Sequence, residues 1–241
     1  MPKTRIDYIF FFTVLALSAI GLIMVFSASP TMALKLGDSY YYLKRHILYL
    51  LLGFAALYFG LRLDLETLKK WSAPIFALSL LILLLVYIPG MGKKVSGALR
   101  WIDLAIFSFQ PSEVIKFTMV LFLANMLSKQ GEGIRFFFRG LLLPLILVGL
   151  VSAIIIVQPD LGTAVAIAST SFVMLFAAGA NLFHLGLIGL MGMGGIIGVS
   201  MSSTYRMQRL IAYLNPWKDP QGVGFHIIQS LLAVGSGGLL G

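Results

Sequence analysis

The 241-residue sequence contains no cysteine, and only 11% of its residues are charged. Without cysteine, neither a disulfide framework nor a thiolate metal site can form. A soluble domain carries about 25% charged residues, so the deficit argues against a water-soluble fold. The three histidines, His46, His184 and His226, lack the spacing of metal ligands, and we predict no metal-binding residues. A Walker loop, a serine-hydrolase elbow and a dinucleotide fingerprint are also missing from the sequence.

Hydrophobic residues make up 59% of the chain, and they gather in seven long apolar runs. Each run approaches the roughly 20 residues that cross a bilayer, and strand-type alternation is not seen. Separate runs can cross lipid only as helices, because unpaired backbone groups are costly there. We therefore predict an all-α, polytopic membrane bundle that forms a single domain over residues 1–241. The predicted spans are 7–28, 46–63, 73–89, 111–128, 141–157, 162–180 and 183–201, and an outer amphipathic tail follows over 202–241.

The formal net charge is +9, and the basic residues lie mainly in short segments between the predicted spans. Anionic membrane lipids are therefore the expected partner of this charge, and no nucleic-acid-binding motif is present. With the N-terminus inside, inner segments hold eight lysines and arginines and outer segments hold nine. The positive-inside rule therefore does not decide the orientation.

The stretch FQPSEVIKF places an acid and a base one helical turn apart at the start of the fourth predicted span. Pro111 suits the first turn of a helix, and Gln110 or Ser112 can supply a capping oxygen. Glu113 alone is explained by the positive end of the helix dipole. Lys116 is harder to explain, because a charge within a span costs about 2.5–3.5 kcal/mol and an i,i+3 ion pair returns only about 0.2–0.5 kcal/mol. We therefore expect this pair to face a hydrated cavity.

The stretch VQPDLGTAV repeats this arrangement at the start of the sixth predicted span. Asp160 can be interpreted as a simple N-cap, with Thr163 able to hydrogen-bond beside it. Two Gln-Pro-acid helix starts on one side of the membrane also favour a shared polar pocket, because irregular helix starts at membrane depth are tolerated where they line a cavity. The residues alone leave both interpretations open.

The tail carries YRMQR, in which Arg206 and Arg209 lie three residues apart with no acid nearby. This pair either anchors the chain at lipid headgroups or clamps a phosphate or pyrophosphate, since guanidinium groups match phosphate geometry. The following NPWKDP is typical of a rigid turn, and its Trp217 suits a membrane interface.

Six segments, in this order, resemble the SEDS family of bacterial cell-wall proteins (shape, elongation, division and sporulation), which includes FtsW, RodA and SpoVE. They are GALRWIDL, FQPSEVIKF, QPDLGT, YRMQRL, NPWKDPQGVGFHIIQS and GSGGLLG, and they cover residues 97 to 241. The FQPSE and QPDLGT pair is the most specific. The NPWKDP and GEGIRFFFRG stretches are more similar to the FtsW branch than to the RodA branch.

The resemblance implies a peptidoglycan glycosyltransferase that polymerises lipid II into glycan strands during cell division or elongation. It also implies a multi-pass protein of the bacterial inner membrane, with a cytoplasmic N-terminus and a periplasmic or extracellular active face. The implied partners are lipid II, undecaprenyl pyrophosphate-linked glycan and a class B penicillin-binding protein. A lipid II flippase or transporter is one alternative, and a non-catalytic membrane scaffold for division or elongation proteins is another.

The same resemblance carries roles onto particular residues. Trp101 matches the family's outer-loop tryptophan, while Glu113, Lys116 and Asp160 match polar positions of its central cavity. The family's catalytic aspartate lies in a His-Thr-Asp-Phe stretch beyond Gly241, so no residue here inherits that role. We therefore expect a C-terminally truncated chain.

Sugar transfer from a pyrophosphate carrier requires a base near the acceptor hydroxyl and positive charge near the leaving group. Arginine and lysine can supply this charge, and a divalent cation, Mg²⁺ or Mn²⁺, is the alternative. The candidate substrate-binding or cavity residues are Trp101, Gln110, Ser112, Glu113, Lys116, Asp160, Thr163, Arg206 and Arg209.

Overall fold

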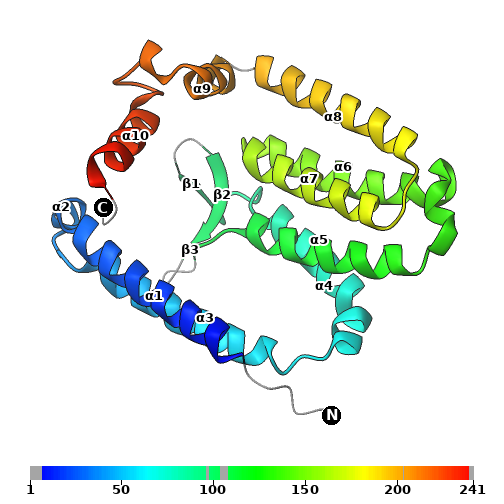
Figure 1. Ribbon diagram of the computed structural model, residues 1–241, viewed down its shortest axis with the longest axis horizontal. Coiled ribbons are helices and arrows are strands. Elements are labelled where there is room, and N and C mark those ends of the chain that lie inside the picture. The colour runs from blue at the N-terminus through cyan, green and yellow to red at the C-terminus, as the bar shows by residue number, and fades with distance from the viewer. Residues whose placement is uncertain (1–6, 96–97, 104–107, 203, 239–241) are drawn as a thin grey trace. The chain divides into compact units, whose positions relative to one another are not determined.

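The computed structural model describes residues 7–95, 98–103, 108–202 and 204–238 (Figure 1). Within these ranges the fold is helical, with one small sheet. The α-helices are α1 (Tyr8–Ala28), α2 (Pro30–Ala33), α3 (Tyr41–Gly60), α4 (Leu65–Leu85), α5 (Pro111–Ser128), α6 (Leu142–Val157), α7 (Leu161–Ala177), α8 (Leu182–Met201), α9 (Thr204–Leu214) and α10 (Phe225–Gly237). Shorter turns are the 3₁₀ segments η1 (Leu34–Leu36), η2 (Gly131–Arg135) and η4 (Pro216–Lys218) and the π turn η3 (Phe137–Leu141).

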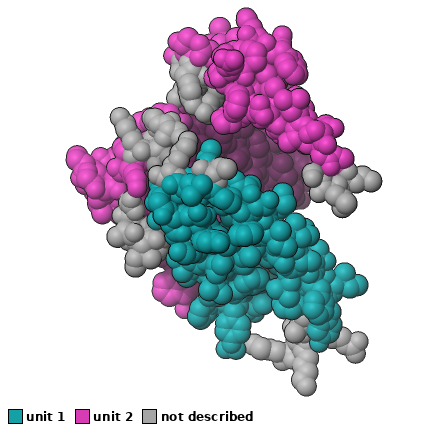
Figure 2. All heavy atoms as spheres, turned by 90° about the vertical axis from the view of Figure 1, so that its left-hand side faces the viewer, with its two compact units in different colours: residues 1–68 teal, residues 69–241 magenta. Residues whose placement is uncertain are grey.

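The chain divides into two compact units, residues 1–68 and 69–241, which Figure 2 colours separately. In the first unit α1 packs against α3, and the Phe26 and Tyr40 rings stack with their centroids 6.2 Å apart. No described residue of α1 or α3 is buried. Such apolar, uncovered helices suit lipid, in which an exposed leucine or phenylalanine carries no hydration penalty.

The seven predicted spans each correspond to a long helix, with shifts of up to eight residues at their ends. Four described helical segments are long and apolar enough to cross a membrane: Tyr8–Ala28, Leu65–Leu85, Phe137–Val157 and Leu182–Met201. The other three predicted spans correspond to α3, α5 and α7. Charged residues occupy the first turns of α3 and α5, and α7 has only 17 residues. The all-α membrane bundle is confirmed, while the crossing of the bilayer by these three helices stays a prediction.

Side-chain caps begin several of the long helices. The Asp7 carboxylate accepts the Phe10 N–H at 3.0 Å before α1, and Asn181 accepts the Phe183 N–H at 2.9 Å before α8. Pro111 opens α5 at the position where its missing N–H costs nothing. Each cap satisfies a backbone donor that has no intrahelical partner.

Three short antiparallel strands lie between α4 and α5, in the order β1 (Gly92–Val95), β2 (Ala98–Asp103) and β3 (Ser108–Phe109). The sequence did not predict them, because strands of two to six residues are too short to display a period-two pattern. Lys93 pairs with Trp101 in the register of the first hairpin, and β2 packs against the start of α5 (Figure 1). The sheet therefore carries Arg100 and Trp101 to the end of the helical bundle at which α5 begins.

The core of the second unit lies among α4, α5, α6 and α7, which run side by side in Figure 1. The Phe76 and Phe122 rings stack at 4.8 Å between α4 and α5. Two polar contacts join the same helices: the Ser79 and Thr118 hydroxyls lie 2.6 Å apart, and the Asn125 amide donates to the Ser72 hydroxyl at 2.8 Å. Ser72 and Ser79 are seven residues apart on α4, and Thr118 and Asn125 are seven residues apart on α5. One antiparallel register of the two helices therefore accounts for both bonds.

Candidate functional site

The starts of α5 and α7 meet at one end of the bundle, as the two Gln-Pro-acid stretches predicted. The Gln110 amide nitrogen lies 3.3 Å from Asp160 Oδ2 and 3.0 Å from the Ser112 hydroxyl. Gln110 occupies the N-cap position of α5, yet its side chain caps no backbone N–H. Of the two side chains able to cap α5, that of Gln110 does not do so; its amide instead connects the beginnings of two helices, with Gln110 and Asp160 50 residues apart in the sequence.

Asp160 is the centre of this arrangement and is 7% exposed. Its Oδ1 accepts the Thr163 N–H at 3.3 Å, which makes it the N-cap of α7. Its Oδ2 accepts the Thr163 hydroxyl at 3.0 Å and lies 3.4 Å from Arg100 Nη1. Asp160 is thus both a cap and a member of a polar cluster. We call Arg100, Gln110, Ser112, Asp160 and Thr163 the Asp160 cluster.

Arg100 reaches the cluster from β2. Its only ion pair among the described residues is the 3.4 Å contact with Asp160, and its buried Nε has no hydrogen-bond partner among them. A guanidinium presents five donors in a planar fork that matches carboxylate and phosphate oxygens. Arg100 therefore forms an ion pair with Asp160, and its planar guanidinium is of the kind that also binds phosphate.

Glu113 and Lys116 form a separate pair farther along α5. The Lys116 ammonium lies 2.8 Å from Glu113 Oε1, and the two side chains are 36% and 56% exposed. The predicted i,i+3 contact is present, and the ammonium remains accessible on the surface of the helix. Because an exposed ion pair contributes only about 0–1 kcal/mol, stability alone gives little reason for a lysine here.

A groove of about 230 Å³ runs between α5 and α7 beside this ammonium. Apart from Lys116, it presents mainly apolar side chains and two hydroxyl groups. We call it the α5–α7 groove, and it is lined by Lys116, Phe117, Met119, Val120, Ala166, Ile167, Thr170 and Ser171. A mainly apolar groove with a cation at its edge suits an amphipathic anion.

Three candidates remain: Trp101, Arg206 and Arg209. Trp101 is partly buried in β2 and pairs with Lys93. Arg206 and Arg209 occupy backbone positions in α9, but their side chains lie outside what the structure describes. Their alternative roles as a headgroup anchor or a phosphate clamp therefore stay predictions.

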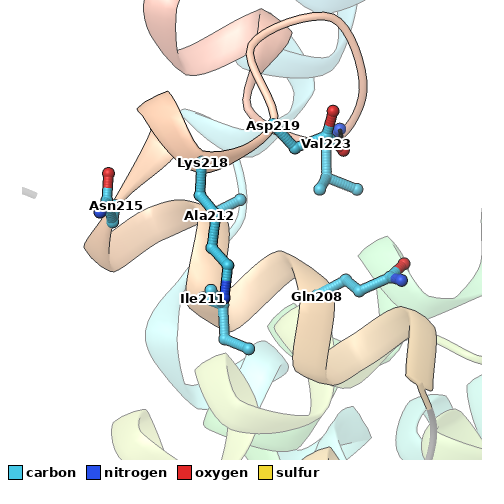
Figure 3. A pocket seen from close by; sticks show the side chains of 7 residues that line it. All are labelled: Gln208, Ile211, Ala212, Asn215, Lys218, Asp219 and Val223. Carbon is cyan, nitrogen blue, oxygen red and sulfur yellow. Dashed lines mark hydrogen bonds between the residues drawn. The ribbon is translucent and has the colours of Figure 1, made fainter.

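The outer tail forms a second pocket of about 300 Å³, between α9 and the turn that contains η4. In Figure 3 the Lys218 side chain extends past Ala212 towards Ile211, and the pocket is completed by Gln208, Asn215, Asp219 and Val223. The turn itself is tightly built, since the Asp219 carboxylate accepts the Gly222 and Val223 N–H groups at 3.0 and 3.2 Å. NPWKDP is thus a rigid turn, as the sequence predicted.

A resident divalent cation does not fit the donors that the structure describes. Asp160 is the buried carboxylate of the cluster, and a guanidinium already neutralises it. Among the described residues, no three His, Asp or Glu side chains gather in a way that could hold a metal ion. Arg100 and Lys116 are cations of the described part of this end of the bundle, and a divalent cation bound together with substrate stays a prediction.

Two features in or beside the Asp160 cluster were not predicted from the sequence. The sequence predicts Arg100 as part of the outer positive charge that meets a pyrophosphate, but it does not predict the contact of Arg100 with Asp160. Gln158, which is 1% exposed and donates to the Leu83 carbonyl at 3.3 Å, carried no signal beyond its place before Pro159.

Sequence comparison relates nearly the whole chain to one family. The family described as cell cycle protein, FtsW/RodA/SpoVE, matches residues 7–241. The chain is 43% identical over 240 residues to stage V sporulation protein E of Bacillus subtilis, covering 99% of this chain and 66% of that protein. It is 41% identical over 238 residues to a probable peptidoglycan glycosyltransferase FtsW of Geobacter sulfurreducens, covering 98% and 64%. The chain thus spans just under two thirds of these relatives.

Solved structures share the fold. A chain of a peptidoglycan synthase complex, described as coordinating polymerization and crosslinking, superposes with a TM-score of 0.73 at 30% identity, covering 98% of this chain and 67% of that chain. The rod shape determining protein RodA of Thermus thermophilus superposes with a TM-score of 0.65 at 30% identity, covering 80% of this chain and 60% of RodA. These likenesses extend the family relation from sequence to architecture.

Proposed function

The chain belongs to the FtsW/RodA/SpoVE family of cell cycle proteins. From this premise we propose that it is part of a peptidoglycan glycosyltransferase that polymerises lipid II. Membership places it among multi-pass membrane proteins of bacterial peptidoglycan synthesis. In the proposed reaction, a sugar hydroxyl of one lipid II attacks the sugar carbon that bears the pyrophosphate of the growing strand. The C–O bond to pyrophosphate breaks, and undecaprenyl pyrophosphate leaves with the bonding electrons.

The observation that carries this proposal is the guanidinium of Arg100 beside Asp160. It lies 3.4 Å from Asp160, its Nε is buried with no partner among the described residues, and Lys116 adds a second accessible cation on α5. Fixed cations stabilise the negative charge that develops on a leaving pyrophosphate. We assign Arg100 and Lys116 to pyrophosphate binding, and no described residue is assigned as the catalytic base.

The α5–α7 groove supports the lipid part of the substrate. Its walls are largely apolar and its polar edge carries Lys116. Part of a prenyl chain would lie in the apolar groove while the pyrophosphate meets the ammonium, so the groove suits the junction between the lipid and its headgroup. This arrangement also gives a reason for the ion pair at a helix start: Glu113 holds the lysine, and the substrate phosphate competes for it.

The orientation and the partner follow from the same proposal. The N-terminus is cytoplasmic, and the Asp160 cluster faces the periplasmic or extracellular side, where lipid II headgroups are polymerised. A class B penicillin-binding protein is the proposed partner, supported by the likeness to a chain from a complex of polymerization and crosslinking. Membrane lipids fill the uncovered faces of α1 and α3.

The test uses the chain in proteoliposomes with purified lipid II, and it reads lipid II affinity and glycan products in parallel. Binding that is weakened about tenfold by Arg100→Ala and by Lys116→Ala, but not by Lys129→Ala at the opposite end of α5, is the expected result. Equal binding by all three variants would contradict the assignment. Transport of lipid II across the vesicle would favour a flippase, and binding of the crosslinking partner without binding of lipid II would favour a scaffold.

A further inference from the structure

Gln158 lies between two helix ends and contacts both the bundle core and the start of α7. Its side chain is 1% exposed, and its amide nitrogen donates to the Leu83 carbonyl at 3.3 Å. Leu83 belongs to the last turn of α4, where carbonyl groups lack intrahelical partners. The Leu84 and Leu85 carbonyls accept N–H groups from the following turn, each at 3.1 Å. Gln158 therefore completes the C-terminus of a helix that is 73 residues away in the sequence.

Tyr87 makes the reciprocal contact. Its hydroxyl donates to the Ile154 carbonyl at 2.6 Å, in the last turn of α6. Gln158, which follows α6, thus donates to a carbonyl of α4, and Tyr87, which follows α4, donates to a carbonyl of α6. We call Tyr87 and Gln158 the α4–α6 clasp.

The segments that carry Asp160 and Arg100 both begin close to this clasp in the sequence. On one side, Pro159 alone separates Gln158 from Asp160, and the Gln158 and Asp160 N–H groups both donate to the Ile155 carbonyl. On the other side, β1 begins five residues after Tyr87. Gly92 in β1 packs so closely on the Val86 carbonyl that a side chain at this position would collide with it. The hairpin that carries Arg100 is therefore seated directly on the end of α4.

We infer that Gln158 is a positioning residue, which with Tyr87 sets the separation of Arg100 and Asp160. At this separation the guanidinium forms an ion pair with the carboxylate, and its planar fork is of the kind that also binds phosphate. The role rests on the proposed function, since it concerns the geometry of the same phosphate site. Simple packing does not account for Gln158, because its Oε1 is buried with no partner among the described residues. An apolar side chain of equal length would fill the space without leaving an unpaired acceptor.

A distance measurement tests the clasp without any ligand. Because the chain has no cysteine, spin labels can be placed uniquely at Lys93→Cys in β1 and Gly162→Cys in α7. A Cβ at Gly162 meets open space, so the label site is tolerated. We expect a narrow distance distribution in nanodiscs, broadened by Gln158→Met and by Tyr87→Phe. Gln130→Met is the matched control, since Gln130 also has a buried, unpartnered Oε1 but follows the opposite end of α5. An unchanged distribution in Gln158→Met overturns the inference.

Lipid II binding is measured on the same samples. Misplaced binding groups are expected to lower affinity about tenfold in Gln158→Met, with the melting temperature close to that of the parent and of Gln130→Met. Broadening without any change in affinity would overturn the link between the clasp and the phosphate site. If Gln158→Met fails to fold, the test uses Tyr87→Phe, which removes a single oxygen. The distance distribution and the lipid II affinity of this variant then decide. If the parent binds no lipid II, the proposed function fails, and the distance measurement still judges the clasp.

Discussion

At the residue scale, the Asp160 carboxylate gathers its neighbours in two different ways. Toward its own helix it is a cap for the Thr163 N–H, and toward the sheet it faces Arg100. A neutral amide could keep the first role and would lose the second. The N-cap interpretation is thus present in the structure, and the same side chain also contacts Gln110 and Arg100, while a shared polar pocket stays a prediction.

Replacing Asp160 by asparagine separates these roles. Asp160→Asn retains an oxygen for the cap but leaves the largely buried Arg100 without its counter-ion, so we expect a loss of about 1–3 kcal/mol in unfolding free energy. Thermal unfolding in detergent measures the change. Asp219→Asn, which alters an exposed carboxylate in the tail turn, is the control. Stability equal to the parent in Asp160→Asn would show that the Arg100 contact carries no weight.

Lys116 is expected to behave oppositely. Its ion pair with Glu113 is more than one third exposed, so Lys116→Met should change the unfolding free energy by at most about 0.5 kcal/mol. The same variant should weaken lipid II binding, because the groove loses its cation. Melting curves and binding isotherms on one preparation distinguish the two effects. A variant that melts early and binds normally would make Lys116 a structural residue.

At the element scale, helices α4 and α5 are held in register by two polar contacts one heptad apart. Ser79 and Thr118 are both buried, and their hydroxyl groups lie 2.6 Å apart. In lipid, interhelical hydrogen bonds contribute about 0.6 kcal/mol on average and up to about 1.7 kcal/mol. The pair at the centre of the core should lie towards the upper value.

A double-mutant cycle measures this contact. Ser79→Ala, Thr118→Val and the double variant are expected to give a coupling energy of about 0.6–1.7 kcal/mol, from unfolding in mixed micelles. Thr170→Val, an exposed threonine of the α5–α7 groove, should be additive with Ser79→Ala. Additivity of the Ser79 and Thr118 changes would mean that the hydroxyl groups do not stabilise the packing.

The tail turn has no room for a side chain at Gly224. A side chain at Gly224 would collide with the Pro216 carbonyl, whereas one at Gly235 in α10 would meet open space. We expect Gly224→Ala to loosen the turn and Gly235→Ala to leave it unchanged. Limited proteolysis between residues 214 and 225 would report the difference. Equal resistance in the two variants would argue that the turn tolerates displacement.

At the scale of the whole molecule, the alternation of helices sets which segments share a side of the membrane. If all seven long helices cross, the segment with β1 and the tail turn lie on one side, and the loop after α5 lies on the other. The Gln110–Asp160 contact requires the starts of α5 and α7 to share a side. It does not say which side is outside.

Single cysteines in the cysteine-free chain can answer this question. Lys93→Cys and Gln221→Cys should react with an impermeant maleimide added to intact cells, while Glu132→Cys should react only after lysis. The three positions lie in β1, the tail turn and η2, and all are exposed. Labelling of Glu132→Cys in intact cells would contradict either the cytoplasmic N-terminus or the crossing of α5.

Composition and apolar run length by themselves determined the membrane bundle, because lipid permits few ways to satisfy a backbone and each long run has to become a helix. The two Gln-Pro-acid stretches likewise marked the starts of α5 and α7, since proline and a capping acid suit that position. The sequence could not indicate the strand that carries Arg100, the amide bond from Gln110 to Asp160, or the clasp of Tyr87 and Gln158. Those contacts join residues 50 to 75 positions apart, and only the packing of whole helices decides which distant side chains meet.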